Sequence, residues 1–223
     1  MELIVGNIAF STWSLRPWLV LKRCGADFTL TEIPLYGDGW KDRLAEVSPS
    51  GKVPLLKVDG ETIWDSLAIS VWAAERYPQA GLWPKDASAR WLCRSVVCEM
   101  HSGFGALRTD CSMGPDAHGV IHTMVGPDRA EPPTSEAVAT DVRRLVEIMV
   151  TMRGRFGANG PYLFGDWSMA DAFLTPVACR FRHYQIDLAA HGETDGVAAA
   201  YVAALLRQPD FLDWTERAVT QAG

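Results

Sequence analysis

The sequence predicts an α/β domain over residues 1–79, a linker over 80–86 and an all-helical domain over 87–223. Two observations predict this division. Strand-like and helix-like patterns alternate as far as Tyr77-Pro78, where proline ends a helix. Beyond the linker every periodic stretch has helical spacing. A chain of 223 residues is also long enough for two small domains.

The first part of the chain predicts a parallel pair of strands joined by a helix. Leu3–Val5 is typical of a short buried strand, and a loop then leads to a helix from about Leu15 to Cys24. Residues 28–33 alternate between apolar and polar side chains and predict a second strand. Because a helix connects the two strands, they should run parallel with a right-handed crossover.

A hairpin and a capped helix are predicted next. Pro54 opens the apolar run 55–58, Asp59-Gly60 turns the chain, and 61–63 returns as the antiparallel partner. Asp65-Ser66 then supplies the N-cap of a helix that extends to Arg76. The extended backbone at Val53-Pro54 would lie close to this helix N-terminus. Together they could hold a small peptide, with its carboxylate at the helix N-terminus.

Helices of different lengths are predicted for the second part of the chain. The stretch 112–134 holds three glycines and four prolines and should not be helical. The helix over 168–184 is mostly apolar and should be buried, with a kink at Pro176. The predicted helices are 90–107, 135–156, 168–184, about 193–206 and 211–220.

Bulk properties exclude several functions. A net charge of −6 and a pI near 5.4 argue against a nucleic-acid-binding protein. No apolar run reaches the roughly 20 residues of a membrane span, and the first residues lack the features of a signal peptide. The five cysteines have neither paired spacing nor zinc-ligand spacing. We therefore expect a protein of the reducing cytoplasm, without a disulfide framework or a metal.

A hydroxyl-rich segment, Ser11-Thr12-Trp13-Ser14, lies between the first strand and the first helix. Either serine could cap the helix, and Ser11 could instead donate a hydrogen bond to a ligand thiol. Lowering a thiol pKa of ~8.5 by about two units takes roughly 2.7 kcal/mol. One charge-assisted hydrogen bond of roughly 1.5–3 kcal/mol and a helix terminus of roughly 0.3–1 kcal/mol can supply it. No histidine precedes His101, so a serine nucleophile activated by a histidine is not expected here.

With these residues the chain resembles the cytosolic glutathione transferases over nearly its whole length. The segment Ser11–Ser14 followed by Arg16 is similar to the serine motif of the zeta class and related bacterial groups. Gly165–Asp171 is similar to the family's helix-capping signature, in which Ser168 and Asp171 cap each other. The resemblance implies the glutathione transferase fold: a thioredoxin-like βαβ-ββα domain and then a helical domain. It also implies a homodimer that uses glutathione as its cosubstrate.

The resemblance assigns roles to individual residues. Val53-Pro54 matches the dipeptide that binds the cysteinyl backbone of glutathione, and Asp65-Ser66 matches the pair that holds its γ-glutamyl end. Lys52 stands where relatives contact the glycyl carboxylate. The candidates for the hydroxyl that stabilises the thiolate are Ser11, Thr12 and Ser14, and the sequence leaves the choice among them open.

The second, electrophilic substrate is expected between the domains. Phe10 replaces the tyrosine of several classes, and Trp13 replaces the cysteine of the zeta class. The indole would reshape the electrophile pocket if it faces inward, and burial in the core is the alternative. Phe104 could equally be core, Arg108 a surface or dimer residue, and Arg180 the partner of a carboxylate such as Asp171 or Glu99. The candidate pocket residues are Trp13, His101, Phe104, Arg108, Arg180 and Tyr184, with Met113 beside them.

Three functions follow from these patterns. The first is a glutathione transferase whose thiolate, stabilised by a serine, attacks a small electrophile. The second is a glutathione-dependent isomerase or dehalogenase using the same thiolate. The third is a non-catalytic glutathione-binding or scaffold protein of the same fold. A thiol–disulfide oxidoreductase is disfavoured because Ser11 occupies the position of the redox cysteine.

Overall fold

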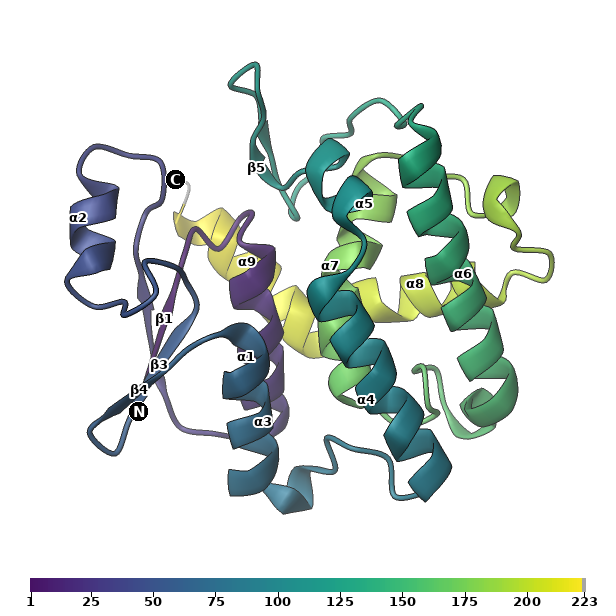
Figure 1. The fold of residues 1–223 in the computed structure, drawn as a ribbon, viewed down its shortest axis with the longest axis horizontal. Helices are drawn as coiled ribbons and strands as arrows, with labels where there is room; N and C mark the ends of the chain where they lie inside the picture. The colour runs from purple at the N-terminus through teal and green to yellow at the C-terminus, as the bar shows by residue number, and fades with distance from the viewer. Residues whose placement is uncertain (222–223) are drawn as a thin grey trace.

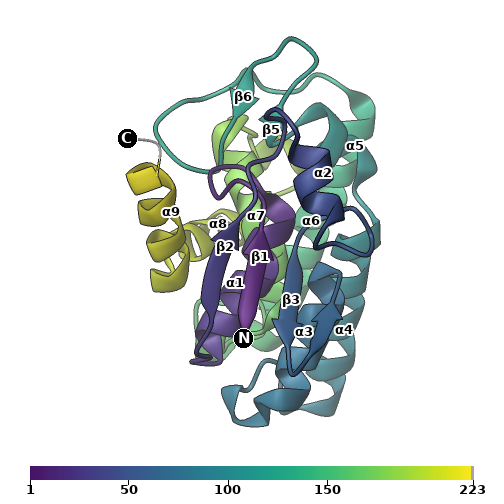
Figure 2. The same cartoon turned by 90° about the vertical axis from the view of Figure 1, so that its left-hand side faces the viewer.

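A computed structural model describes residues 1–221, so the last two residues of the predicted helical domain lie outside it. Its main sheet has the strand order β2-β1-β3-β4 (Figure 2). β1 is parallel to β2 and antiparallel to β3, and β3 pairs with β4 in the predicted hairpin. The sheet is therefore mixed, as the sequence predicts. Its strands are β1 (Glu2–Val5), β2 (Thr29–Glu32), β3 (Leu55–Val58) and β4 (Glu61–Ile63).

Helices cover both faces of this sheet. α1 (Thr12–Arg23) and α3 (Ser66–Arg76) lie between the sheet and the remaining helices, and α2 (Trp40–Ala45) lies on the outer side (Figure 1). Leu3 and Val5 belong to the large core on the inner face, whereas Ile4 packs with Leu44 on the outer face. Burial on both faces explains why β1 is apolar without alternation.

Two predictions for this part of the chain were wrong. α1 begins at Thr12, three residues before the predicted start, so Ser14 lies inside the helix and does not cap it. α2 was not predicted, because its six residues are too few to establish a helical period. The spacing of Trp40 and Leu44, four residues apart and both in the outer cluster, was its only signal.

The rest of the chain is mainly helical (Figure 1). A short hairpin, β5 (Gly114–Pro115) and β6 (Ile121–His122), lies in the stretch predicted to be non-helical. Three single turns of 3₁₀ helix occupy Pro78–Ala80, Gly157–Asn159 and Ala189–His191. The α-helices here are α4 (Ala87–Ser102), α5 (Gly105–Asp110), α6 (Glu136–Phe156), α7 (Met169–His183), α8 (Val197–Arg207) and α9 (Pro209–Gln221).

The prediction of one helix over 90–107 was wrong, because the chain breaks between α4 and α5. Gly103 donates its backbone N–H to Glu99 O, and a Cβ at Gly103 would lie 2.7 Å from that oxygen. Phe104 follows in the left-handed region with φ 58° and is buried. Helical spacing cannot reveal this break, because the side chains on either side of it remain apolar.

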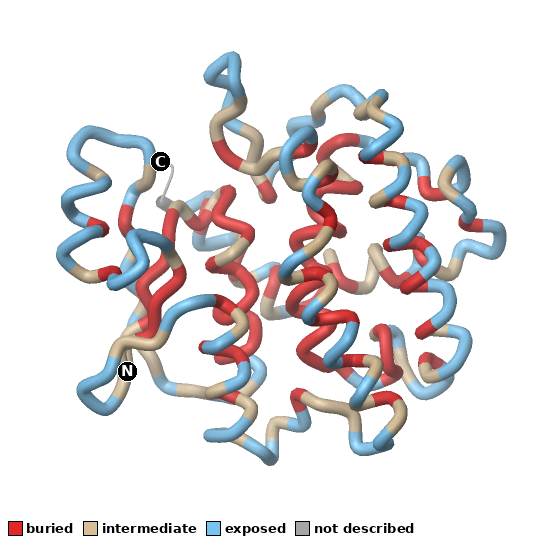
Figure 3. The backbone as a smooth tube through the Cα atoms, in the orientation of Figure 1, coloured by how far each residue is buried: buried red, intermediate tan, exposed pale blue. Residues whose placement is uncertain are grey.

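α7 is the central helix of the core and is almost wholly buried (Figure 3). Its predicted capping box is present: Ser168 is the N-cap residue, and its backbone N–H donates to Asp171 Oδ2 at 2.7 Å. Pro176 lies inside the helix. No helix within residues 1–221 combines the length and the apolar character needed to cross a membrane.

Candidate functional site

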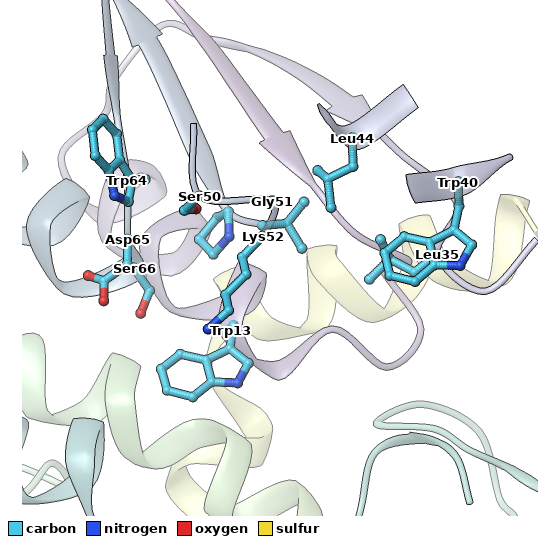
Figure 4. Close-up of a pocket in the computed structure, with 12 residues that line it drawn as sticks. Trp13, Leu35, Trp40, Leu44, Ser50, Gly51, Lys52, Trp64, Asp65 and Ser66 are labelled. Atoms are coloured by element: carbon cyan, nitrogen blue, oxygen red, sulfur yellow. The ribbon is translucent and has the colours of Figure 1, made fainter. Parts of the chain in front are cut away.

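A cavity of about 500 Å³ opens beside the hairpin, between the start of β3, the N-terminus of α3 and Trp13 of α1 (Figure 4). All five residues predicted to bind glutathione line it, together with residues of the loops that lead to α2 and to β3. Its lining consists of Trp13, Leu35, Trp40, Leu44, Ser50, Gly51, Lys52, Val53, Pro54, Trp64, Asp65 and Ser66.

The N-terminus of α3 presents two polar groups at this cavity. Asp65 is the N-cap residue, and its Oδ1 accepts from Leu67 N at 2.9 Å and from Ala68 N at 3.1 Å. Its second oxygen remains directed away from the helix. The Ser66 hydroxyl is buried and has no hydrogen-bond partner among the described residues. A ligand that accepts from Ser66 would satisfy this hydroxyl at a helix N-terminus, where anions are favoured.

A second cavity of about 340 Å³ lies next to the first. The two share Trp13, Leu35 and Val53, and the hydroxyl residues Ser11 and Thr12 line the second. The indole of Trp13 therefore faces inward and forms a wall of both cavities. The second cavity is lined by Phe10, Ser11, Thr12, Trp13, Leu35, Tyr36, Val53, Arg108, Ser112, Met113 and Arg180.

The three candidate hydroxyls are not equivalent. Ser14 is fully buried, lines neither cavity, and accepts from Gly6 N at 3.1 Å and from Ser11 Oγ at 2.8 Å. These contacts tie the loop after β1 to α1. A hydroxyl has a single proton, so Ser11 must turn that proton away from Ser14 to donate to a thiolate. Ser11 and Thr12 lie on the cavity side at the first turn of α1, where the helix dipole favours negative charge.

Two arginines, Arg108 and Arg180, line the second cavity, and a third, Arg16, packs against the Trp13 ring of its wall. Arg16 is 1 % exposed and stacks between the rings of Trp13 at 4.3 Å and Phe173 at 4.9 Å. Its Nε and Nη1 have no partner among the described residues. Burial, with repulsion from Arg180 and Arg108, lowers the pKa of Arg16 to about 9. Burial likewise lowers the pKa of Arg180 to about 10. Both Arg16 and Arg180 therefore remain cationic at neutral pH.

Arg180 does not pair with either carboxylate that the sequence offered. Its Nε donates to Cys111 O at 3.0 Å, whereas Asp171 accepts from Tyr201 and Glu99 pairs with Arg144. Among the ion pairs within residues 1–221, none includes Arg16, Arg108 or Arg180. The cavity wall is therefore strongly positive in a chain whose net charge is −6.

The remaining predicted pocket residues lie outside the second cavity. Phe104 packs in the core at the break before α5, and Tyr184 is buried with its hydroxyl donating to Ser112 O at 2.8 Å. His101 lies behind Trp13, edge-on to the indole at 5.4 Å, and contacts Asp65. Although the helix is broken between them, His101 and Arg108 both pack against the Trp13 ring, at 5.4 Å and 5.5 Å from its centroid.

Sequence reasoning missed Arg16 as part of this site. The available signal was its position three residues after Trp13, which places the two side chains on one face of α1. Leu35, Tyr36 and Ser112 came from loops, and no local pattern marks them.

A histidine network attaches the β5–β6 hairpin beside the second cavity. His122 Nδ1 lies 3.0 Å from His183 Nε2 of α7, and His122 Nε2 lies 3.2 Å from Asp116 Oδ2. At the other end, Met124 N donates to Ala9 O at 2.7 Å. Burial, together with repulsion from His122, lowers the pKa of His183. The network thus holds a wall of the cavity through an imidazole that resists protonation.

This network predicts acid-sensitive stability. Below pH ~6.5 the unfolded chain binds a proton at residue 183 that the folded chain excludes, so the free energy of unfolding falls as the pH is lowered. For one proton the slope is at most about 1.4 kcal/mol per pH unit. We expect His183→Gln to have a flatter profile in urea unfolding between about pH 7.5 and 5.5. The exposed His118→Gln is the matched control. A His183→Gln profile parallel to that of the wild type would contradict the prediction.

The sequence is similar to one family model and to several known proteins. Residues 10–76 match the family model described as the glutathione S-transferase N-terminal domain. The chain is 28 % identical to the maleylacetoacetate isomerase of Rattus norvegicus over 196 residues, which cover 86 % of this chain and 83 % of the relative. It is also 28 % identical to a probable maleylacetoacetate isomerase of Drosophila melanogaster, covering 79 % of this chain and 67 % of that one.

Solved structures share the fold. A glutathione transferase homologue from Burkholderia with bound glutathione has a TM-score of 0.71 at 24 % identity, covering 98 % of both chains. A bacterial maleyl pyruvate isomerase of the zeta class has a TM-score of 0.70 at 22 % identity, again over 98 % of both chains. The predicted fold, a thioredoxin-like part followed by helices, is thereby confirmed.

Proposed function

Because the chain belongs to the glutathione transferase family, we propose that it uses the thiolate of glutathione to attack a small anionic electrophile. One observation carries this proposal. The cavity of the predicted glutathione residues and the arginine-lined cavity meet at Trp13 and Val53, beside the hydroxyls of Ser11 and Thr12. A thiol bound at this junction faces both the groups that would ionise it and the space for a second substrate.

Glutathione binds in the first cavity. Ser66 donates its unpaired hydroxyl to the γ-glutamyl carboxylate at the N-terminus of α3, and Asp65 Oδ2 accepts from the adjoining ammonium group. Lys52 contacts the glycyl carboxylate, and the backbone of Val53 pairs with the cysteinyl residue. The sulfur then lies toward Ser11, at the entrance of the second cavity.

The thiol loses its proton to water and remains a thiolate. Ser11 donates a hydrogen bond to the sulfur, and the N-terminus of α1 adds its positive potential. Ser11 is a hydrogen-bond donor in this scheme and forms no covalent bond. The thiolate forms a carbon–sulfur bond with the electrophile, which either releases a leaving group such as a halide ion or takes up the electron pair of the double bond that the attack opens.

The three arginines favour an anionic second substrate, and they support isomerisation as a second candidate function. The relatives named above are maleylacetoacetate isomerases, and a maleyl group is a cis-unsaturated acid. In that reaction the thiolate adds to the double bond, the resulting single bond rotates, and elimination of the thiolate returns glutathione unchanged. Arg108 and Arg180 would hold the carboxylate in place.

We also propose that the protein is a homodimer in the cytoplasm. α3 and α4 bound a groove lined mainly by apolar side chains, among them Leu67, Val71 and Val97. Two tryptophans of the same segments are also exposed. Trp91, in α4, is 64 % exposed, and Trp64, directly before α3, is nearly half exposed. A second copy of the chain would cover such a surface.

Arg108→Met tests the charge of the second substrate. We expect it to lower kcat/KM for a maleyl-type dicarboxylate by about tenfold or more, the effect of one charge-assisted hydrogen bond. For a neutral aryl halide the change should stay within about threefold. The exposed Arg143→Met of α6 is the control. Equal losses on both substrates would argue against anion recognition. Absence of glutathione-dependent turnover over a broad electrophile panel would favour the non-catalytic binding protein.

A further inference from the structure

His101 connects the helical part of the chain to the N-terminus of α3. Its Nε2 lies 3.0 Å from Asp65 Oδ2, while Asp65 Oδ1 accepts from Leu67 N and Ala68 N. Three donors on two oxygens fix both the position and the plane of this carboxylate. This matters because the Asp65 side chain is 51 % exposed and would otherwise reorient in water.

The imidazole is held in one orientation by its surroundings. It packs edge-on against Trp13, with ring centroids 5.4 Å apart, and lies 6.3 Å from the ring of Phe173. Since a carboxylate only accepts hydrogen bonds, Nε2 is the donor and a neutral imidazole has no proton on Nδ1. Nδ1 is buried without a partner among the described residues. Within residues 1–221, Asp65 is therefore the only polar group that the ring engages.

A carboxylate oxygen can accept two hydrogen bonds at once. Asp65 Oδ2 can therefore keep the bond from His101 and also accept from an ammonium group in the first cavity, which Asp65 lines. His101 itself does not line that cavity. His101 contacts two residues that do line it, Trp13 and Asp65, and Asp65 is the one that takes its hydrogen bond.

We propose that His101 is the positioning residue of the γ-glutamyl subsite, holding the Asp65 carboxylate for the ammonium group of glutathione. This role rests on the proposed function, because it requires glutathione in the first cavity. It differs from the role in the electrophile pocket expected from the sequence. Here α4 acts on the cosubstrate, through a contact between α4 and α3.

The test compares two ligands and two variants by titration calorimetry. The ligands are glutathione and an analogue in which hydrogen replaces the γ-glutamyl ammonium group. His101→Phe keeps an aromatic ring against Trp13 and removes the donor, whereas His101→Gln retains an N–H near the position of Nε2. We expect His101→Phe to weaken glutathione binding roughly three- to tenfold and the analogue less than about twofold. His101→Gln should restore most of the glutathione affinity.

Two further measurements complete the test: the steady-state kinetics of His101→Phe, and the effect of His101→Phe in a protein that already carries Asp65→Asn. In His101→Phe the KM for glutathione should rise by the same factor as the dissociation constant, with kcat within about twofold of the wild type. In an Asp65→Asn background, His101→Phe should cause no further loss, because the carboxylate it positions is gone. His101→Leu also removes the donor and repeats this comparison, with and without Asp65→Asn, if the phenylalanine variant does not fold.

The outcomes separate the two proposals. Equal losses for both ligands, or none for glutathione, would overturn the role of His101 while leaving the proposed function intact. Glutathione binding that depends on His101, in a protein without turnover, would support the positioning role and overturn the enzymatic one. A wild-type protein that binds neither ligand would overturn both.

Discussion

Ser11→Ala is expected to lower glutathione-dependent turnover about eightfold at pH 7, through the ionisation of the bound thiol. The structure supports Ser11 because it lines the second cavity at the N-terminus of α1. Losing its hydrogen bond would raise the pKa of the thiol from ~6.5 to ~8, because the N-terminus of α1 keeps its share of roughly 0.3–1 kcal/mol, and the thiolate fraction at pH 7 falls by that factor. Titrating the ultraviolet absorbance of the thiolate in the complex measures this change directly.

The neighbouring hydroxyls supply the controls for Ser11. Thr12→Val keeps the shape of Thr12 and removes its hydroxyl, so an effect larger than that of Ser11→Ala would transfer the role to Thr12. Ser14→Ala removes the acceptor of both Gly6 N and Ser11 Oγ. We expect it mainly to lower the free energy of unfolding, with a smaller effect on the pKa of the bound thiol. An unchanged thiol titration in Ser11→Ala would exclude Ser11 as the donor.

The sequence predicted the parts of the site that are contiguous in the chain. The stretch from Lys52 to Ser66 contains a proline, a turn and a helix cap, and each signals its local conformation. Since these signals adjoin one another, the residues predicted to bind glutathione line one cavity. The capping box of Ser168 and Asp171 was predictable for the same reason.

The second cavity could not be predicted in this way, because its wall comes from segments far apart in the sequence. Arg108, Ser112 and Arg180 meet there only because α5, the loop after it and α7 pack together. The break at Gly103-Phe104 turns α5 away from the line of α4, and the apolar pattern conceals that break. His101 was consequently expected at the electrophile, whereas the structure places it against Asp65.

The largest effect on stability is expected at Asp171, at the N-terminus of α7. Its carboxylate is fully buried and accepts hydrogen bonds from Leu163 N, Ser168 N, Ser168 Oγ and Tyr201 Oη. Asp171→Ala leaves these donors buried without an acceptor, and each unsatisfied group costs about 1–3 kcal/mol. Some donors will find water, so we expect unfolding to become easier by about 3–5 kcal/mol in urea titrations.

Graded variants distinguish this explanation from a simple loss of packing. Tyr201→Phe removes one of the donors and keeps the ring, so it should cost only about 1–2 kcal/mol. Asp171→Asn keeps the size of the side chain but replaces one acceptor oxygen with an amide N–H₂ group, which cannot accept from the neighbouring donors. We expect it to lower the free energy of unfolding nearly as much as Asp171→Ala does. The exposed Asp166→Ala should stay within about 0.5 kcal/mol of the wild type. If Asp171→Asn proved as stable as the wild type, volume and not hydrogen bonding would account for the role of Asp171. The hydrogen bonds that Asp171 accepts are therefore expected to hold the start of α7, which also carries Arg180 to the second cavity.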